Sequence, residues 1–464
     1  METKANETNF LATVQRNNNW ATFLPALQTM EIYTFSKYLN STEGRGTYAA
    51  LDYLRFLDDS HPRLIEYDWA LVSAAHSYRF KPANFLYQTD ATLVGDSGGY
   101  SIATGSWGAD WLDPNDPQAE KYRKHSKRFQ MRYTNIGTIL DIPVLALNIG
   151  NGHLIGCKTF DDCLEATRIN IEYFLEPVSG IDEMFRQGHN FRWLNVLQGT
   201  SSADSAYWYQ EVKQYSMPHP TRDHCRGWSF AGVNMANIRV ALQRISAIIE
   251  DGLLYNWIHF LGTTTLNRAT LFSYIQQALR KHHNPNISVS FDTARVSFRV
   301  VNGLQTVGAH LEHQSDWTFN SSRSVSRKHY WNDSRYIDDI IREDFQPYKQ
   351  TASLFGSDLT GADMCPTMIG YGTDDIATLY QYVNELAETI YWIQEANRQA
   401  DQNRFPSEQL WNEWNAREAI DDVLSKPTHA ERLHRIDYFQ PLWEQFKSVR
   451  GITAHDIKDY ELEN

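Results

Sequence analysis

The sequence is short of cysteine, of long apolar runs and of positive charge. Its four cysteines are scattered with no CxxC pair, so we predict neither a disulfide framework nor a zinc ribbon; they are Cys157, Cys163, Cys225 and Cys365. No stretch has the length and hydrophobicity of a membrane-spanning helix, and the first twenty residues show no basic segment leading into an apolar one. We therefore expect an intracellular, cytoplasmic protein with reduced thiols and no membrane partner.

Positive charge is outnumbered by negative charge. Lys and Arg number 43 against 56 Asp and Glu, a formal net charge of −13. This balance opposes nonspecific attraction to a polyanion, so a nucleic acid would have to meet a local basic patch. The 464 residues suffice for one large domain with an appended piece.

Eight short apolar runs alternate with longer amphipathic segments, which is the pattern of repeated strand and helix units. The predicted strands are ATFLPAL from Ala21, DWALVSAA from Asp68, ATLVGD from Ala91, GTILDI from Gly137, RWLNVLQG from Arg192, GWSFAGV from Gly227, WIHFLG from Trp257 and ISVSFD from Ile287. We predict an α/β fold, a (β/α)₈ TIM barrel in residues 1–300. A mainly helical extension is expected in residues 301–464, where LYQYVNELAETIYWIQEANRQA has helical apolar spacing.

Polar residues and glycines follow six of these apolar runs. In a TIM barrel the carboxyl ends of the strands build the active site, whereas an open doubly wound sheet gathers its ligand contacts at one switch point. Six successive strand ends therefore favour the barrel. The residues are Asp96, Asp141, Gln198, Gly232, Gly262 and Asp292.

The aspartates among them also have ordinary structural explanations. Asp96 opens DSGGY, where it would cap backbone amides in a turn, and Asp292 would cap a helix. Asp141 has the same two explanations. Three such aspartates at three strand ends, with Gln198 and Gly199 at a fourth, make independent caps less persuasive. Together they indicate a site for acid/base or nucleophilic chemistry.

The order DSGGY, ILD, LQG, AGV, FLG and FD, over about residues 60 to 300, resembles the catalytic barrel of the tRNA-guanine transglycosylase superfamily. The resemblance implies that Asp292 is the nucleophile and that Asp96 acts in acid/base chemistry. It implies a base-binding set of Ser97, Gly98, Gly99 and Tyr100 around the base, Asp141, Gln198 and Gly199 at its edge, Gly232 and Val233 in a backbone turn, and Leu261 and Gly262 on the opposite ring face.

These residue types suit base exchange. Displacing a base from C1′ passes through an oxocarbenium-like state, so one carboxylate can form a glycosyl-enzyme while another group moves protons. An ionised aspartate accepts the N1–H and N2–H₂ edge of guanine, and O6 needs a donor such as an amide N–H. The set of Asp141, Gln198 and the Gly232 amide supplies that pattern.

The sequence departs from the tRNA enzymes after the nucleophile. Their C-x-C-x-x-C…His zinc site is missing, because Cys365 stands alone, and their basic run is reduced to TARVSFR. His153, Cys157 and Cys163 form only a weakly spaced alternative cluster, so we expect no metal and no other cofactor. In what it keeps and lacks, the chain is more similar to the DpdA-type DNA transglycosylases of bacteria and their phages, which place 7-deazaguanine bases into DNA.

We therefore expect DNA and a free base, of the 7-cyano- or 7-aminomethyl-7-deazaguanine type, as partners. The alternatives are the same chemistry on tRNA, a retaining glycoside hydrolase using the two aspartates, and a catalytically silent barrel that binds nucleic acid. A solvated face is the ordinary explanation of a charge run. The residues expected to contact the DNA backbone are Lys121, Lys124, Arg128, Arg295, Arg323, Arg327 and Lys328.

Overall fold

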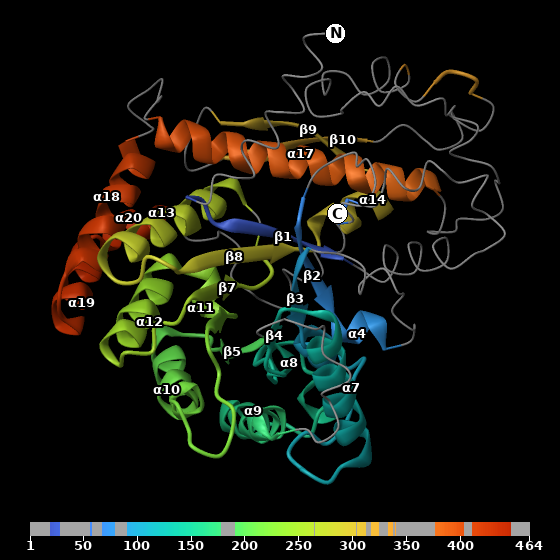
Figure 1. The fold of residues 1–464 in the computed structure, drawn as a ribbon, viewed down its shortest axis with the longest axis vertical. Coiled ribbons are helices and arrows are strands. Elements are labelled where there is room, and N and C mark those ends of the chain that lie inside the picture. Colours follow the sequence, from blue (N-terminus) through green and yellow to red (C-terminus); the bar gives the residue numbers. More distant parts are fainter. Residues whose placement is uncertain are drawn as a thin grey trace.

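Eight parallel strands close into a barrel in chain order, with β8 paired to β1 (Figure 1). The computed structural model describes residues 19–27, 56–57, 67–78, 91–177, 191–263, 265–302, 304–311, 317–323, 333–336, 339, 376–402 and 411–446. The strands are β1 (Thr22–Leu27), β2 (Trp69–Ser73), β3 (Thr92–Asp96), β4 (Ile136–Thr138), β5 (Arg192–Leu197), β6 (Trp228–Phe230), β7 (Trp257–Phe260) and β8 (Ser288–Thr293). The predicted TIM barrel is confirmed, and each strand falls within or beside one of the eight apolar runs.

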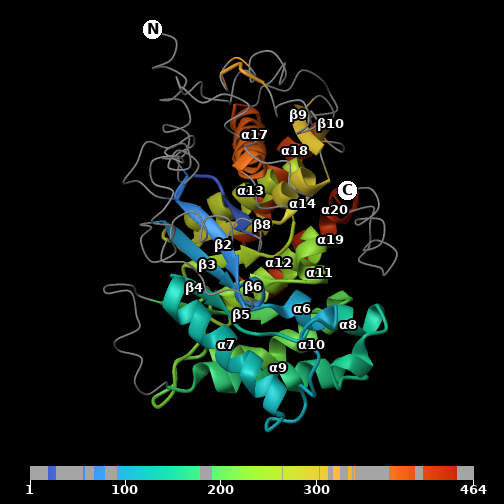
Figure 2. The same cartoon turned by 90° about the vertical axis from the view of Figure 1, so that its right-hand side faces the viewer.

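Helices connect the strands and cover the outside of the barrel (Figures 1 and 2). The long ones are α7 (Pro117–Tyr133), α9 (Phe160–Leu175), α10 (Ser202–Val212), α12 (Ile238–Glu250) and α13 (Leu266–His282). Short ones lie near the strand ends; they are α4 (Ala74–Ser77), α6 (Gly99–Ala103), α8 (Leu145–Asn148), η1 (Gly152–Leu154), η2 (Lys213–Ser216) and α11 (Val233–Ala236).

The segment after β6 forms two helices, α11 and α12, separated at Asn237. Asn237 is extended, and its side chain accepts a hydrogen bond from the Arg239 amide. This N-cap starts a new helix because asparagine competes for backbone donors in this way. The interruption leaves α11 as a separate turn beside the strand ends.

The floor of the barrel is apolar. Inward side chains from six of the strands form one buried cluster: Leu24, Ala26, Leu71, Val94, Ile136, Leu194 and Trp257. The rings of Trp69 and Trp257 stack inside it, with centroids 5.7 Å apart. Since side chains alternate along a strand, the residues two positions beyond these point inward at the carboxyl end. That register brings polar groups to the mouth above a dry floor.

The described residues of the C-terminal part add a hairpin and several helices. After α14 (Arg295–Val301), strands β9 (Leu304–His310) and β10 (Thr318–Arg323) pair antiparallel. The helices are α17 (Ile376–Asp401), α18 (Trp411–Ser425), α19 (His429–Tyr438) and α20 (Gln440–Gln445). Helix α17 packs against α13, α14 and β9, and both views place it on the side of the barrel opposite α9 (Figures 1 and 2). Helices are present as expected, together with a small sheet that the sequence did not indicate.

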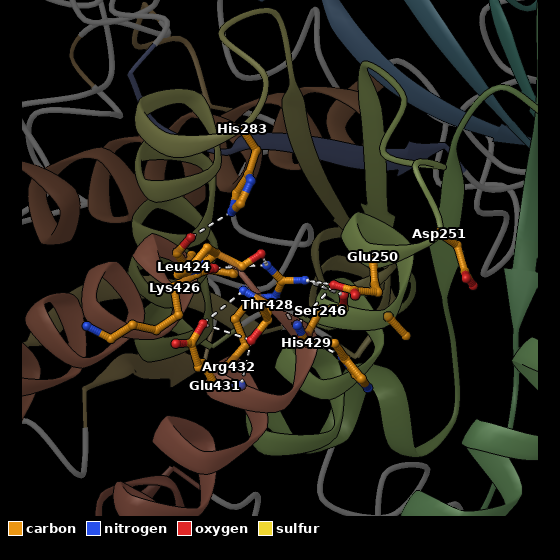
Figure 3. A network of polar contacts seen from close by, with 12 residues as sticks. Ser246, Glu250, Asp251, His283, Leu424, Lys426, Thr428, His429, Glu431 and Arg432 are labelled. Carbon is orange, nitrogen blue, oxygen red and sulfur yellow. Dashed lines mark hydrogen bonds and ion pairs between the residues drawn. The ribbon is translucent and has the colours of Figure 1, made fainter.

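Helix α19 is attached to the barrel through Arg432 (Figure 3). This fully buried side chain bonds to the Ser246 hydroxyl at 2.8 Å and to a carboxylate oxygen of Glu250 at 2.9 Å, both on α12. It also donates to the carbonyls of Lys426 and Pro427. A buried guanidinium with its donors satisfied holds two helices in one arrangement.

Among the described residues, the structure contains no helix that is both long and apolar enough to cross a bilayer.

Candidate functional site

The candidate site lies at the mouth of the barrel, above the apolar floor. Val94 and Trp257 point into the floor, so Asp96 and His259, two residues further along their strands, point inward at the mouth. Asp292 on β8 joins them, since its Oδ1 lies 3.3 Å from Nε2 of His259 and its charge acts on Asp96. The strand register therefore assembles groups from distant parts of the chain.

Asp96 is held by its neighbours on two strands. Ser73, its register partner on β2, hydrogen-bonds to the carboxylate, and the Gly98 amide donates to Oδ1 at 3.3 Å. Desolvation raises the pKa of Asp96; the Ser73 and Gly98 hydrogen bonds and His76 oppose the rise, and Asp292 adds to it. A carboxyl group in such surroundings is suited to carry a proton and release it during catalysis.

Sequence reasoning missed Ser73 and His76, which lie beside Asp96. His76 is in α4, and its ring hydrogen-bonds to the backbone of Leu27 at the end of β1. Burial lowers the pKa of His76, opposed by the Asp96 charge. The signal was present, because Ser73 lies near the end of the second apolar run and His76 directly follows it, at the end that carries polar residues on other strands.

The residues expected to read a guanine edge are brought together by the fold. The Gln198 amide donates from Nε2 to Oδ2 of Asp141, and a side chain at Gly232 would place its Cβ 3.1 Å from Gln198 Oε1. A Cβ at Gly99 would lie 2.7 Å from Oδ1 of Asp141. Glycine at position 99 therefore allows the DSGGY backbone to approach the Asp141 carboxylate.

Asp141 has an unusual charge state. Burial raises its pKa from 3.8 to about 6, and the nearby Asp96 charge adds to the rise, while the Gln198 hydrogen bond opposes it. Its side chain is almost fully buried. At neutral pH the site therefore presents a desolvated carboxylate, which gains strongly from accepting hydrogen bonds.

The turn after β6 was expected to bind the base through Gly232 and Val233, but the two residues differ in the structure. The Val233 amide donates to the carbonyl of Gly199 at 2.9 Å, so it is committed to joining two strand-end turns and does not contact a base through its N–H. Asn234 reinforces this junction by donating to the carbonyl of Gln198 at 3.1 Å. The neighbouring Gly232, with φ of +56°, has no acceptor for its N–H within the described residues. Of these two amides, that of Gly232 is without a hydrogen-bond partner in the part of the chain that the structure describes.

The Asp292 carboxylate is fixed through one oxygen. Its Oδ1 accepts the Gly262 amide at 2.8 Å and lies 3.3 Å from Nε2 of His259. Its Oδ2 has no hydrogen-bond or ion-pair partner within the described residues. Sequence reasoning also missed His259, although it stands inside the quoted run WIHFLG, because an isolated histidine in an apolar run usually reads as core.

Tyr100 and Leu261 differ in their exposure. Tyr100, in α6, is 57% exposed. Leu261 is partly buried, and its amide donates to the Phe230 carbonyl at 3.0 Å. Ser97 is buried, with its amide bonded to the Thr138 hydroxyl at 3.0 Å.

The basic residues expected to contact DNA lie in different parts of the chain. Lys121, Lys124 and Arg128 are exposed along one face of α7. Arg323 ends β10, and Arg327 and Lys328 lie outside the described residues.

Arg295 makes its contacts within the protein. Its guanidinium lies 3.9 Å from the Phe319 ring centroid and 3.4 Å from a carboxylate oxygen of Glu385, with a largely buried side chain. Arg299 pairs with the same buried carboxylate at 2.7 Å. Both arginines after the nucleophile therefore attach α14 to α17 instead of facing a polymer.

The weakly spaced cluster of His153, Cys157 and Cys163 is not assembled. Both cysteines are buried, whereas His153 is exposed and its Nδ1 lies 3.0 Å from the Gly150 carbonyl. Within the part of the chain that the structure describes, no three histidine, cysteine or acidic residues are grouped to hold a metal.

No family model matches this chain, and no curated protein matches it either. Function must therefore be argued from the site itself.

Proposed function

We propose that this chain is a DNA-guanine transglycosylase, which exchanges guanine in DNA for a 7-deazaguanine base through a covalent glycosyl-aspartate intermediate. The observation that carries the proposal is the joint placement of two elements at one barrel mouth. One is the catalytic pair Asp96 and Asp292, coupled through their charges. The other is the Asp141 and Gln198 pair, beside the free Gly232 amide.

The Asp141 and Gln198 pair, with the Gly232 amide, favours base exchange over hydrolysis of a sugar. A glycoside hydrolase needs two carboxylates, and Asp96 and Asp292 would satisfy it. It has no need of a third, buried carboxylate bonded to a carboxamide beside an open amide. That set offers the Asp141 carboxylate as an acceptor for the N1–H and N2–H₂ groups of guanine and the Gly232 amide as a donor for O6.

The residues define a sequence of steps. Oδ2 of Asp292 attacks C1′ as the bond from C1′ to N9 breaks, and the bonding electrons pass to the base. Asp96, whose pKa is raised by burial, delivers a proton to the departing guanine. It recovers a proton from N9–H of the incoming 7-deazaguanine, which attacks C1′ and displaces Asp292. Two inversions retain the configuration, and no net proton is consumed.

DNA is proposed as the polymer for two reasons. The zinc-ligand run of the tRNA enzymes, which the sequence otherwise resembles, is missing after Asp292. The two arginines that remain there are occupied by Glu385. We assign backbone contact to the exposed face formed by Lys121, Lys124 and Arg128.

The test is incorporation of labelled guanine or 7-deazaguanine into duplex DNA and, in parallel, into tRNA. Label in DNA alone is the expected result. Label in tRNA alone would show that the same reaction takes place on tRNA, and so would overturn DNA as the polymer. Label in neither would overturn the whole proposal.

Replacement of the nucleophile tests the intermediate. Asp292→Asn preserves shape but removes the attacking charge, so both exchange and the covalent protein–DNA adduct on a denaturing gel should disappear. Asp161→Asn, an exposed site on α9, is the matched control and should exchange normally. An adduct formed by Asp292→Asn would refute the assignment of the nucleophile.

A further inference from the structure

A buried polar chain rises from the barrel floor to Asp292. The Trp257 indole Nε1 donates to the Ser290 hydroxyl oxygen at 3.0 Å, and the same oxygen lies 2.9 Å from Nδ1 of His259. Nε2 of His259 then lies 3.3 Å from Oδ1 of Asp292. The His259 side chain is completely buried, so no bulk water competes for its ring nitrogens.

The hydrogen-bond partners of Ser290 indicate which nitrogen of the His259 ring carries the proton. Ser290 Oγ already accepts from Trp257, and the only other partner of its hydroxyl within the described residues is Nδ1 of His259. If Nδ1 accepts the hydroxyl proton, the neutral ring carries its own proton on Nε2. The opposite tautomer would leave the hydroxyl proton unpartnered and aim a nitrogen lone pair at a carboxylate oxygen, and both are unfavourable when buried.

The protonated Nε2 faces the oxygen that Gly262 also holds. The Gly262 amide donates to Oδ1 at 2.8 Å, and the buried Nε2 of His259, which has no hydrogen-bond partner within the described residues, lies 3.3 Å from the same oxygen. The other oxygen, Oδ2, remains without a partner in the described part of the chain. A carboxylate that is already held in the attacking orientation needs less reorganisation to reach the transition state.

We propose that His259 is a positioning residue, which holds Oδ1 of Asp292 through Nε2–H and so presents Oδ2 to the reacting carbon. Ser290 contacts the His259 ring, and Trp257 in turn contacts Ser290. Together they fix the orientation and the tautomer of the ring, as the hydrogen-bond partners of functional histidines do in other proteins. The inference rests on the proposed function for the reaction, but the hydrogen-bond contact itself can be tested without activity.

The kinetic test compares three variants with the wild type under steady-state conditions. His259→Phe keeps the ring volume and removes both nitrogens, so kcat should fall about 100-fold with little change in KM, as when a preorganised donor is deleted. His259→Gln keeps an N–H near the position of Nε2 and should recover about tenfold of that loss. Ser290→Ala should lower kcat by about tenfold, because it frees the ring without removing it.

A purely structural role predicts a different pattern. It would make His259→Phe, the better apolar replacement, at least as active as His259→Gln, and that order would overturn the proposal. His219→Gln, at an exposed histidine, is the matched control and should leave kcat unchanged. Thermal unfolding of each variant separates a loss of activity from a loss of folded protein.

The contact is tested independently by nitrogen-15 NMR of protein labelled at histidine, with His259→Phe identifying the signals. The expected result is a protonated Nε2 and a bare Nδ1, with the Nε2 shift changing in Asp292→Asn. A protonated Nδ1 with a bare Nε2 would overturn the proposal. If the wild type exchanges no base, the proposed function fails while this spectrum still decides whether His259 holds Asp292.

Discussion

Replacement of Asp141 by asparagine should stabilise the folded chain at alkaline pH while destroying base exchange. The folded-state pKa of Asp141 is about 6, against an ordinary value of 3.8. For an acid whose pKa is raised on folding, the stabilising effect is present below the ordinary value and is lost as the pH rises through the folded value. At pH 8 the buried carboxylate is therefore ionised at the expense of folding free energy.

The magnitude follows from the size of the shift. A rise of about 2 pKa units corresponds to a cost of about 3 kcal/mol when the group is fully ionised. Asparagine has nearly the same shape, carries no charge, and its Oδ1 can still accept the Gln198 hydrogen bond. The variant should thus be up to about 3 kcal/mol more stable than the wild type at pH 8. By linkage, the advantage should fall to about half of that at pH 5.

The assay is denaturant unfolding of both proteins between pH 5 and pH 8, with base exchange measured in parallel. Exchange should fall at least about 100-fold, because the amide cannot accept both N–H groups of the guanine edge. The wild type should likewise lose affinity for the free base as the pH falls below about 6. A variant less stable than the wild type at pH 8 would refute the reasoning, since desolvation would then not dominate at this site.

Two other perturbations test separate parts of the structure. Gly99→Ala places a methyl carbon 2.7 Å from Oδ1 of Asp141 and so pushes the carboxylate aside. Affinity for the free base, measured by calorimetry, should fall about tenfold with thermal stability nearly unchanged; unaltered affinity would show that the position of this carboxylate does not matter for binding. Glu385→Ala leaves the buried Arg299 without its partner and should cost about 3 kcal/mol in denaturant unfolding, whereas Glu418→Ala at an exposed site of α18 should cost little. Equal losses in the two glutamate variants would contradict the assigned role of the ion pair.

Local sequence patterns were sufficient for the barrel and for the aspartates at its mouth. Apolar runs of strand length separated by amphipathic segments specify strand and helix units, because burial imposes the same periodicity wherever such units pack. The positions of Asp96 and Asp292 followed, since a residue at the end of a buried parallel strand lies at one known end of the barrel. The predicted ends of the strands were within a few residues, which kept these positions correct.

Only the tertiary structure decided which polar groups lie in contact and which already have hydrogen-bond or ion-pair partners within the protein. Arg295 and Val233 looked open to ligand in the sequence, but partners distant in the chain, Glu385 and Gly199, occupy them. His259 looked like a core residue, yet closure of β7 against β8 aims its ring at Asp292. Hydrophobic periodicity is a local property that the sequence carries directly. The pairing of hydrogen bonds and charges depends on which strands and helices become neighbours, and that is settled only when the barrel closes and α17 packs against it.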